Sequence, residues 1–203
     1  MTDPALAVPP VPGELRTARL LLRPWHRDDA ERLLPVLESN RAHLGPWIPR
    51  RVSEPAPIPE LAERLAGFAA EFAASREWRY AMFALEDDRV LGEIALFPRS
   101  TTGRVALASA DRAEIGYWLR EDATGTGLAT EAAWAMLALA RALPAFGHVE
   151  IRCDARNAAS AAIPIRLGFT LAATEDATGV GMEELVALQV WTLGLARAHE
   201  STG

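Results

Sequence analysis

A hairpin in the first half of the chain restricts the possible folds more than any other feature of the sequence. Residues 78–85 read WRYAMFAL and residues 89–97 read RVLGEIALF, and both runs are apolar and rich in residues that favour strands. Only the tripeptide Glu86-Asp87-Asp88 separates them. Because a connection this short joins antiparallel strands, an entirely parallel, doubly wound sheet is not expected.

The rest of the chain alternates between strand-like and helix-like patterns. Apolar residues at helical spacing begin behind Asp28 and Asp29 and end at Asn40, and a second such run covers residues 59–75. We expect further strands over residues 19–25, 113–120, 148–154, 169–174 and 185–193, and further helices over residues 127–141 and 156–167. The segments 43–59 and 175–183 are expected to be loops.

This order of elements predicts an α+β fold with a mixed, mostly antiparallel central sheet of about seven strands and helices on both faces. The chain has 203 residues and is 50% hydrophobic, which suffices for one substantial core. We therefore expect a single domain over residues 15–196. It would be preceded by a flexible, proline-rich tail, residues 1–14, and followed by a C-terminal tail, residues 197–203.

Composition excludes several classes of protein. Cys153 is the single cysteine, so no intramolecular disulfide can form, and no signal peptide or membrane-spanning apolar run is evident. These features predict a cytoplasmic protein without a membrane partner. The net charge of −6 argues against a nucleic-acid partner and is compatible with a cationic substrate or simply with solubility. Both a monomer and a homodimer remain open.

A glycine-rich loop, EDATGTGLATEA at residues 121–132, stands directly before the third predicted helix. The first N–H groups of a helix lack intrahelical partners and carry partial positive charge, so Gly125 and Gly127 could let this backbone bind a phosphate without any Lys or Arg. A tight turn without a ligand is the alternative. The loop lacks the Gly-Lys-Ser/Thr ending of a P-loop, and Thr130 stands where a dinucleotide motif has its third glycine.

Four motifs in order make a resemblance specific. The run EIGYWLREDATGTGLATEA, residues 114–132, is similar to the pyrophosphate motif of the GNAT superfamily of N-acetyltransferases, and in particular of its RimJ/RimL-like branch. Three other segments resemble that branch: RTARLLLRPWHRDDA at 16–30, HLGPWIP at 43–49 and RNAASAAIPIRLGF at 156–169. Together they cover most of residues 15–195.

The resemblance implies acetyl-CoA as the cofactor. The residues implied to bind it are Tyr117, Trp118, Leu119, Thr124, Gly125, Thr126, Gly127, Leu128, Ala129, Thr130, Asn157 and Ser160. Asp122 stands where the family has Gln or Arg, and Thr124 and Thr126 replace frequent basic residues. We therefore expect hydroxyl donors in place of cations, and weaker binding of the pyrophosphate.

The resemblance also implies direct acyl transfer without an acyl-enzyme. The strand at residues 115–120 would diverge from its neighbour, and a backbone N–H near Gly116 or Tyr117 would stabilise the thioester oxygen. No Tyr follows on the next helix, so Ser160 is implied to stabilise or protonate the leaving thiolate. Asn157 would cap the helix, contact the pantetheine arm, or do both.

The general base is predicted from strand alternation, which places Glu114 on one face with Gly116 and Trp118. Partial burial would raise the pKa of such a carboxylate and make it a better proton acceptor. Glu93, Glu183, Glu184 and water remain alternatives. The four histidines form no metal-ligand cluster, so no metal is expected, and Cys153 is expected to be a packed residue rather than a nucleophile.

The resulting hypothesis is transfer of an acetyl group from acetyl-CoA to a primary amine, either a protein N-terminus or a small molecule. The loop around Trp47, the first two helices and the loop before the last strand would build the acceptor groove. A small-molecule detoxifying acetyltransferase and a transferase for another acyl group, such as succinyl, are alternatives. A CoA-binding regulatory protein with weak catalysis is an alternative of another class.

Overall fold

The strands form one open, mixed sheet in the computed structural model, which describes residues 10–178 and 185–195. Their order is β1-β2-β3-β4-β6-β7-β9-β8, and β5 pairs with β4. The bounds are β1 (Leu15–Arg16), β2 (Leu20–Pro24), β3 (Trp78–Ala84), β4 (Val90–Ser100), β5 (Gly103–Arg104), β6 (Arg112–Leu119), β7 (His148–Asp154), β8 (Thr170–Thr178) and β9 (Leu185–Gly194). Of these nine strands, β1 and β5 have only two residues, so seven make up most of the described sheet, as predicted.

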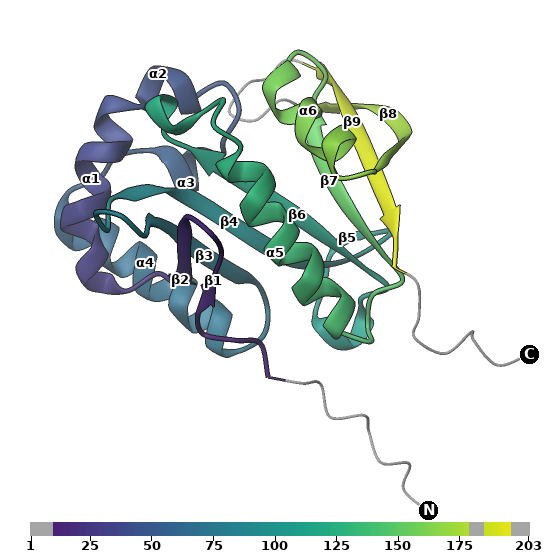
Figure 1. Cartoon of the computed structure of the whole chain (residues 1–203), viewed down its shortest axis with the longest axis horizontal. Coiled ribbons are helices and arrows are strands. Elements are labelled where there is room, and N and C mark those ends of the chain that lie inside the picture. Colours follow the sequence, from purple (N-terminus) through teal and green to yellow (C-terminus); the bar gives the residue numbers. More distant parts are fainter. Residues whose placement is uncertain (1–9, 179–184, 196–203) are drawn as a thin grey trace, which may run out of the picture.

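Helices cover both faces of this sheet. They are α1 (Ala30–Ser39), α2 (Arg41–Leu44), α3 (Arg50–Ser53), α4 (Ile58–Ala73), α5 (Leu128–Ala142) and α6 (Ala158–Arg166). Short 3₁₀ turns at Arg27–Asp29 and Glu121–Ala123 lead from β2 into α1 and from β6 into α5, and a third, Leu107–Ser109, lies between β5 and β6. Figure 1 shows α5 crossing one face of the sheet, whereas α1 and α4 pack against the opposite face. The predicted α+β class is therefore confirmed.

Strand alternation divides the buried residues between two cores. In β3, Tyr80 and Met82 belong to the core beneath α5, whereas Ala81 and Phe83 belong to the core beneath α1 and α4. This period of two is what a strand buried on both faces requires. The hairpin prediction is also confirmed, because β3 and β4 pair antiparallel across the turn at residues 85–87.

The expected loop at 43–59 is wrong in part, because this stretch contributes to two short helices, α2 and α3, and to the start of α4. Pro46 and Pro49 interrupt the helical pattern in the sequence and hide it. Leu44 and Val52 are nevertheless buried in the core beneath α1 and α4, and this tertiary packing stabilises single helical turns.

The expected loop at 175–183 is also wrong in part. Residues from Glu175 to Thr178 continue β8 and pair with Leu185–Leu188 of β9. The strand is mostly exposed and polar here, so it lacks the apolar alternation that predicts a strand. Its backbone is held by the neighbouring strand. Residues 179–184 lie outside the described ranges.

Two part-buried hydrogen bonds join segments that are far apart in the sequence. Asn40, which ends α1, accepts a hydrogen bond at Oδ1 from the backbone N–H of Glu121 (2.7 Å). At the N-terminal end of the described chain, the Tyr80 hydroxyl donates to the Pro12 carbonyl (2.7 Å), and Val11 packs against the core. None of the helices within the described residues is long and apolar enough to cross a membrane.

Candidate active site

The central feature of the site is a divergence between two parallel strands. β6 and β7 pair only from Arg112↔His148 to Ile115↔Ile151. Beyond that point β6 stays paired with β4 as far as Leu119, and β7 stays paired with β9 as far as Asp154. The inner edges of both strands are consequently open, and a cavity of about 1630 Å³ lies between them. This is the divergence that the sequence resemblance implied.

The glycine loop forms one end of this cavity. Gly125 and Gly127 adopt positive φ angles of 73° and 85°, which glycine tolerates best. Gly127 is the N-cap of α5, and no side chain caps the helix. A Cβ added to Gly125 would have no heavy atom within 4 Å, so an anion could approach the backbone closely. The first N–H groups of α5 are therefore available as anion donors.

The two loop threonines do not supply free donors. Thr124 Oγ1 donates to the Glu121 carbonyl (2.7 Å), and Thr126 Oγ1 donates to the Ala123 carbonyl (2.8 Å). Each hydroxyl proton is thus used within the loop. The expectation that these hydroxyls replace the missing cations as donors stays a prediction; in the structure their contacts brace the loop.

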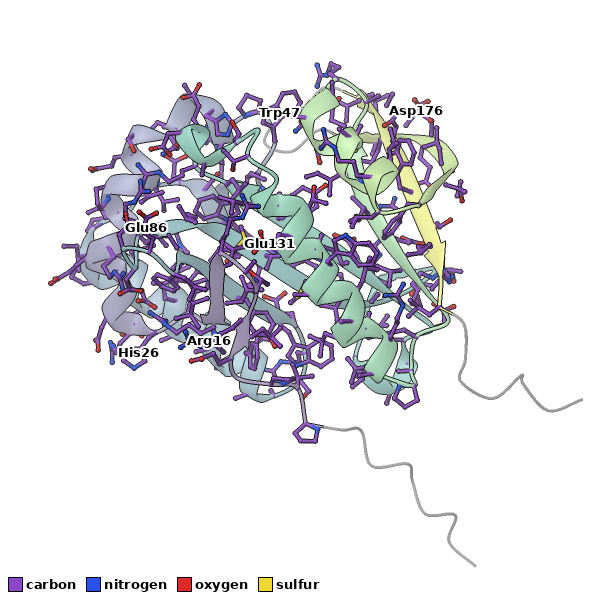
Figure 2. All side chains as sticks on the ribbon, in the orientation of Figure 1. Arg16, His26, Trp47, Glu86, Glu131 and Asp176 are labelled. Atoms are coloured by element: carbon purple, nitrogen blue, oxygen red, sulfur yellow. The ribbon has the colours of Figure 1, made fainter. Side chains whose placement is uncertain are left out.

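A cation does reach the loop, but from a distant part of the sequence. Arg19 donates from Nη1 to the Thr126 carbonyl (2.9 Å) and from Nε to Glu131 (2.7 Å). Glu131, in the first turn of α5, also accepts from Thr17 Oγ1 (2.5 Å). Burial would raise the pKa of Glu131, but these hydrogen bonds outweigh it and the pKa is lowered. Figure 2 shows Glu131 where α5 meets the hairpin of β1 and β2.

The opposite wall carries Asn157, Ser160 and Tyr117. Asn157 is the N-cap of α6, and its Oδ1 accepts from the backbone N–H of Ser160 (3.0 Å). The Tyr117 hydroxyl lies 3.2 Å from Ser160 Oγ and also donates to the Ser160 carbonyl. Burial raises the pKa of Tyr117 far above neutral, so its phenol stays protonated. The chain thus places a tyrosine hydroxyl beside Ser160 from a strand, although no Tyr follows on the helix.

Cys153 lies on the same wall of the cavity. Burial is the largest influence on this thiol and raises its pKa, so at neutral pH it is not a thiolate. This agrees with the expectation of a packed residue rather than a nucleophile.

The face beneath α1 and α4 carries the carboxylates proposed as bases. Glu114 accepts at Oε2 from Arg99 and at Oε1 from Arg104 (3.2 Å). Glu93 accepts from Arg79 and from the Trp25 indole, each at 2.6 Å. Both carboxylates line the cavity, and Glu114 shares a face with Gly116 as strand alternation predicted. Every one of these carboxylate oxygens already has a donor.

The structure brings all described site residues of the sequence prediction to one cavity. They are Glu114, Tyr117, Trp118, Leu119, Thr124, Gly125, Thr126, Gly127, Leu128, Ala129, Thr130, Asn157 and Ser160. Glu183 and Glu184 lie outside the described residues. The sequence reasoning did not identify Arg19, Glu131 and the Tyr117 hydroxyl, because their contacts join segments far apart in the chain. Over residues 10–178 and 185–195, no three His, Cys, Asp or Glu residues gather as metal ligands would.

Comparison with known families decides what kind of site this is. A sequence model of the acetyltransferase (GNAT) domain matches residues 19–170, which is most of the chain. The chain belongs to the GNAT acetyltransferase family. The match includes β2 through the start of β8, and thus both the divergence of β6 from β7 and the glycine loop.

Individual GNAT proteins are similar to this chain at low identity. It is 25% identical over 118 residues to the probable N-acetyltransferase YjcK of Bacillus subtilis (strain 168), which is 58% of this chain. The matched part spans 62% of the length of YjcK, less than two thirds.

Solved structures share the GNAT fold with this chain. RimL, a ribosomal L7/L12 α-N-protein acetyltransferase solved with coenzyme A, superposes with a TM-score of 0.74 at 19% identity. That comparison covers 92% of this chain and 98% of RimL. RimJ of Mycobacterium smegmatis, solved with CoA-disulfide, also gives a TM-score of 0.74, at 21% identity over 94% of this chain and 88% of RimJ.

Proposed function

We propose that this GNAT protein transfers an acetyl group from acetyl-CoA to a primary amine, by direct attack in a ternary complex. One observation carries the proposal: the uncapped N-terminus of α5 and the open edge of β6 line the same cavity. The first fits a pyrophosphate, and the second offers backbone groups to a pantetheine chain. Coenzyme A joins these two chemical groups in one molecule, so the residues present fit it.

The chain's own residues divide the binding work. Backbone N–H groups between Thr124 and Ala129 would hold the pyrophosphate, and Arg19 would keep the loop in place from behind. The backbone of residues 117–119 and the Asn157 side chain would contact the pantetheine. When bound, acetyl-CoA supplies a thioester whose carbonyl carbon accepts a nucleophile.

Three further tasks belong to the reaction centre. A backbone N–H at Gly116 or Tyr117 would stabilise the carbonyl oxygen as it gains charge. Ser160, assisted by the protonated Tyr117 hydroxyl, would donate to the sulfur as the C–S bond breaks and the C–N bond forms. The proton lost by the amine would pass to Glu114 directly or through water, with Glu93, on the same face of the cavity, as the alternative. Both carboxylates are held by arginines, which supports transfer through water.

The acceptor would enter from the face beneath α1 and α4. Figure 2 shows Trp47 between the helices of the first half of the chain and α6, and this residue lines the cavity. RimL carries the name of an α-N-protein acetyltransferase, which supports a protein N-terminus as the acceptor here.

Titration calorimetry with CoA and a thiol-release assay with acetyl-CoA and N-terminal peptides test this proposal. We expect CoA to bind and an acceptor peptide to gain one acetyl group, as measured by mass spectrometry. Arg19→Gln should raise the Kd for CoA about fivefold, because the loop loses charge-assisted hydrogen bonds worth about 1 kcal/mol. Arg27→Gln, which removes an exposed ion pair with Glu63, is the matched control and should leave the Kd unchanged. Absence of CoA binding would contradict the proposal.

A further inference from the structure

The cavity is lined by more positive than negative side chains, although the chain as a whole carries a net charge of −6. Among the described residues, seven arginines and four carboxylates line it. A cavity lined by an excess of cations in an acidic protein suits anionic ligands. The phosphates of a bound CoA would account for cations elsewhere in the cavity, but not for those on the acceptor face.

Arg51 is the first cation on the acceptor face. It lies on α3 and lines the cavity, whereas its neighbour Arg50 does not. Within the described part of the chain, the Arg51 guanidinium has no ion pair, hydrogen bond or ring contact. Among the described residues, none therefore occupies any of its five N–H donors.

Arg104, the second cation, is fixed in orientation but incompletely used. Its guanidinium lies 3.5 Å from the centroid of the Phe97 ring, and 38% of the side chain is exposed. It donates one hydrogen bond to Glu114 and lies 3.8 Å from Glu77. The Phe97 ring and Glu114 fix the orientation of the Arg104 guanidinium, and its remaining N–H groups can bind a second oxyanion.

Among the described residues, the carboxylates on this face pair with Arg104 and with other arginines, and none of them pairs with Arg51. Both oxygens of Glu93 are occupied by Arg79 and Trp25, and Glu114 is already shared between Arg99 and Arg104. Burial is the main cause that lowers the pKa of Arg104; Glu114 offsets it, and the positive charges of Arg79 and Arg51 lower it further. Arg51 and Arg104 both line the cavity, so a carboxylate bound on this face would meet two positive charges.

The position of this pair relates it to the reaction centre. Glu114 and Phe97, which hold Arg104, are two residues along their strands from Gly116 and Ala95, a register pair. Two residues of a strand span roughly 7 Å. An anion at Arg104 would thus lie within one side-chain length of an amine placed beside Gly116.

We infer that the acceptor is a primary amine that also carries a carboxylate, and that Arg51 and Arg104 bind this carboxylate. The inference rests on the proposed acetyl transfer. A peptide whose first residue is Asp or Glu has this chemistry, and so does a small amino acid. The negative net charge of the whole chain favours a cationic acceptor. The positive charge of Arg51 and Arg104 at the acceptor face favours an acceptor that also carries a carboxylate.

Matched acceptors that differ only in charge test the inference. Two otherwise identical peptides begin with Glu or with Gln, and 4-aminobutyrate is paired with its amide to represent small acceptors. We expect kcat/KM with acetyl-CoA to be about tenfold higher for the acid of at least one pair. The pair that shows the preference identifies the source of the carboxylate. Calorimetric Kd values for the acetylated Glu and Gln peptides should show the same order without turnover.

Arg51→Gln is the informative variant, because Arg104 also bonds Glu114. It should reduce the preference for the acid about fivefold and leave the Kd for CoA unchanged, whereas Arg50→Gln should change neither. Equal kcat/KM for acid and amide in both pairs would overturn the inference while leaving the acetyl transfer intact. A preference that Arg51→Gln does not reduce would also overturn it. If no amine is acetylated, both the proposed function and the inference fail.

Discussion

At the scale of single residues, the hydroxyl pair of Ser160 and Tyr117 shows what a motif predicts and what it omits. The motif Asn-x-x-Ser predicted a helix cap and a polar group at the cavity, and Asn157 is indeed the cap. The partner of Ser160 was not predictable from the motif, because Tyr117 comes from a strand 43 residues earlier. Its hydroxyl is protonated at neutral pH, burial raises its pKa further, and it can relay a proton or orient Ser160.

Replacement of Ser160 by Ala tests this role. We expect kcat to fall about 100-fold, in the range typical for loss of a proton donor, with little change in the Kd for CoA. The cap should persist, because Asn157 accepts from the backbone N–H of residue 160 rather than from its hydroxyl. Tyr117→Phe, which keeps the ring, should give a smaller loss of kcat, and an unchanged kcat in Ser160→Ala would remove Ser160 from the mechanism.

For Glu114, the sequence predicted the position of the side chain but not its partners. Alternation along β6 placed it on the correct face with Gly116 and Trp118. Its two arginine partners come from β4 and β5, and nothing local in the sequence around Glu114 indicates them. Its role as the base therefore stays a prediction, and the arginines make a water-mediated path the more direct interpretation.

At the scale of elements, the contact between β4 and β6 depends on a glycine. A Cβ at Gly92 would lie 2.0 Å from the Trp118 carbonyl oxygen and 3.0 Å from the Leu119 Cα. Both atoms are backbone, so no side-chain rotation could relieve the clash. This close approach holds the end of β6 against β4 at the point where β6 has left β7.

Gly92→Ala should therefore be destabilising. We expect a loss of about 3 kcal/mol in the free energy of unfolding, measured by urea denaturation, because a well-packed site must shift to accept the methyl group. Gly67→Ala is the matched control: it lies on an exposed position inside α4, with no heavy atom within 4 Å of the added Cβ. There Ala should stabilise the protein by up to about 1 kcal/mol, because it is the better helix former. Equal effects of the two changes would contradict this account.

At the scale of the whole molecule, carboxylates join different elements of the fold. Asp29 accepts hydrogen bonds from both terminal nitrogens of Arg23 (2.7 Å each) and so joins the start of α1 to β2. Glu131 joins α5 to Arg19 next to β2, and Glu150 joins β7 to Arg112 of β6. For all three carboxyls burial alone would raise the pKa, but their hydrogen bonds and ion pairs outweigh it and the pKa is lowered.

The sign of the pH dependence follows from these lowered values. A carboxylate whose folded pKa lies below its unfolded value stabilises the fold above the unfolded pKa, and this contribution is lost as pH falls through the folded pKa. Asp29→Asn should therefore cost about 2 kcal/mol at pH 7, and the difference from the wild type should shrink below about pH 4. Asp28→Asn is the control: its side chain is 81% exposed, and we expect a change within about 0.5 kcal/mol. Urea midpoints at pH 7, 5 and 3.5 measure both, and a difference for Asp29→Asn that is constant with pH would contradict the assignment.

Local chemistry let the sequence by itself determine the main elements and the type of site. The signals in the sequence act over only a few residues. They are the short connection between two strands, the strand period of 2 and the helix period of 3.6, the cap Asn157 three residues before Ser160, and the glycines before a helix. The mostly antiparallel sheet, the divergence of β6 from β7 and the residues around the cavity followed from them and from the resemblance.

Only the tertiary structure decided which charges meet. Arg19 reaches Glu131 across 112 positions, and Arg104 reaches Glu114 through strand register. Strand register, burial and the packing of helices on each face set these contacts, and none of them leaves a periodic trace in the sequence. The net charge of −6 is a property of the whole sequence, whereas the excess of arginines at the cavity exists only once the chain has folded.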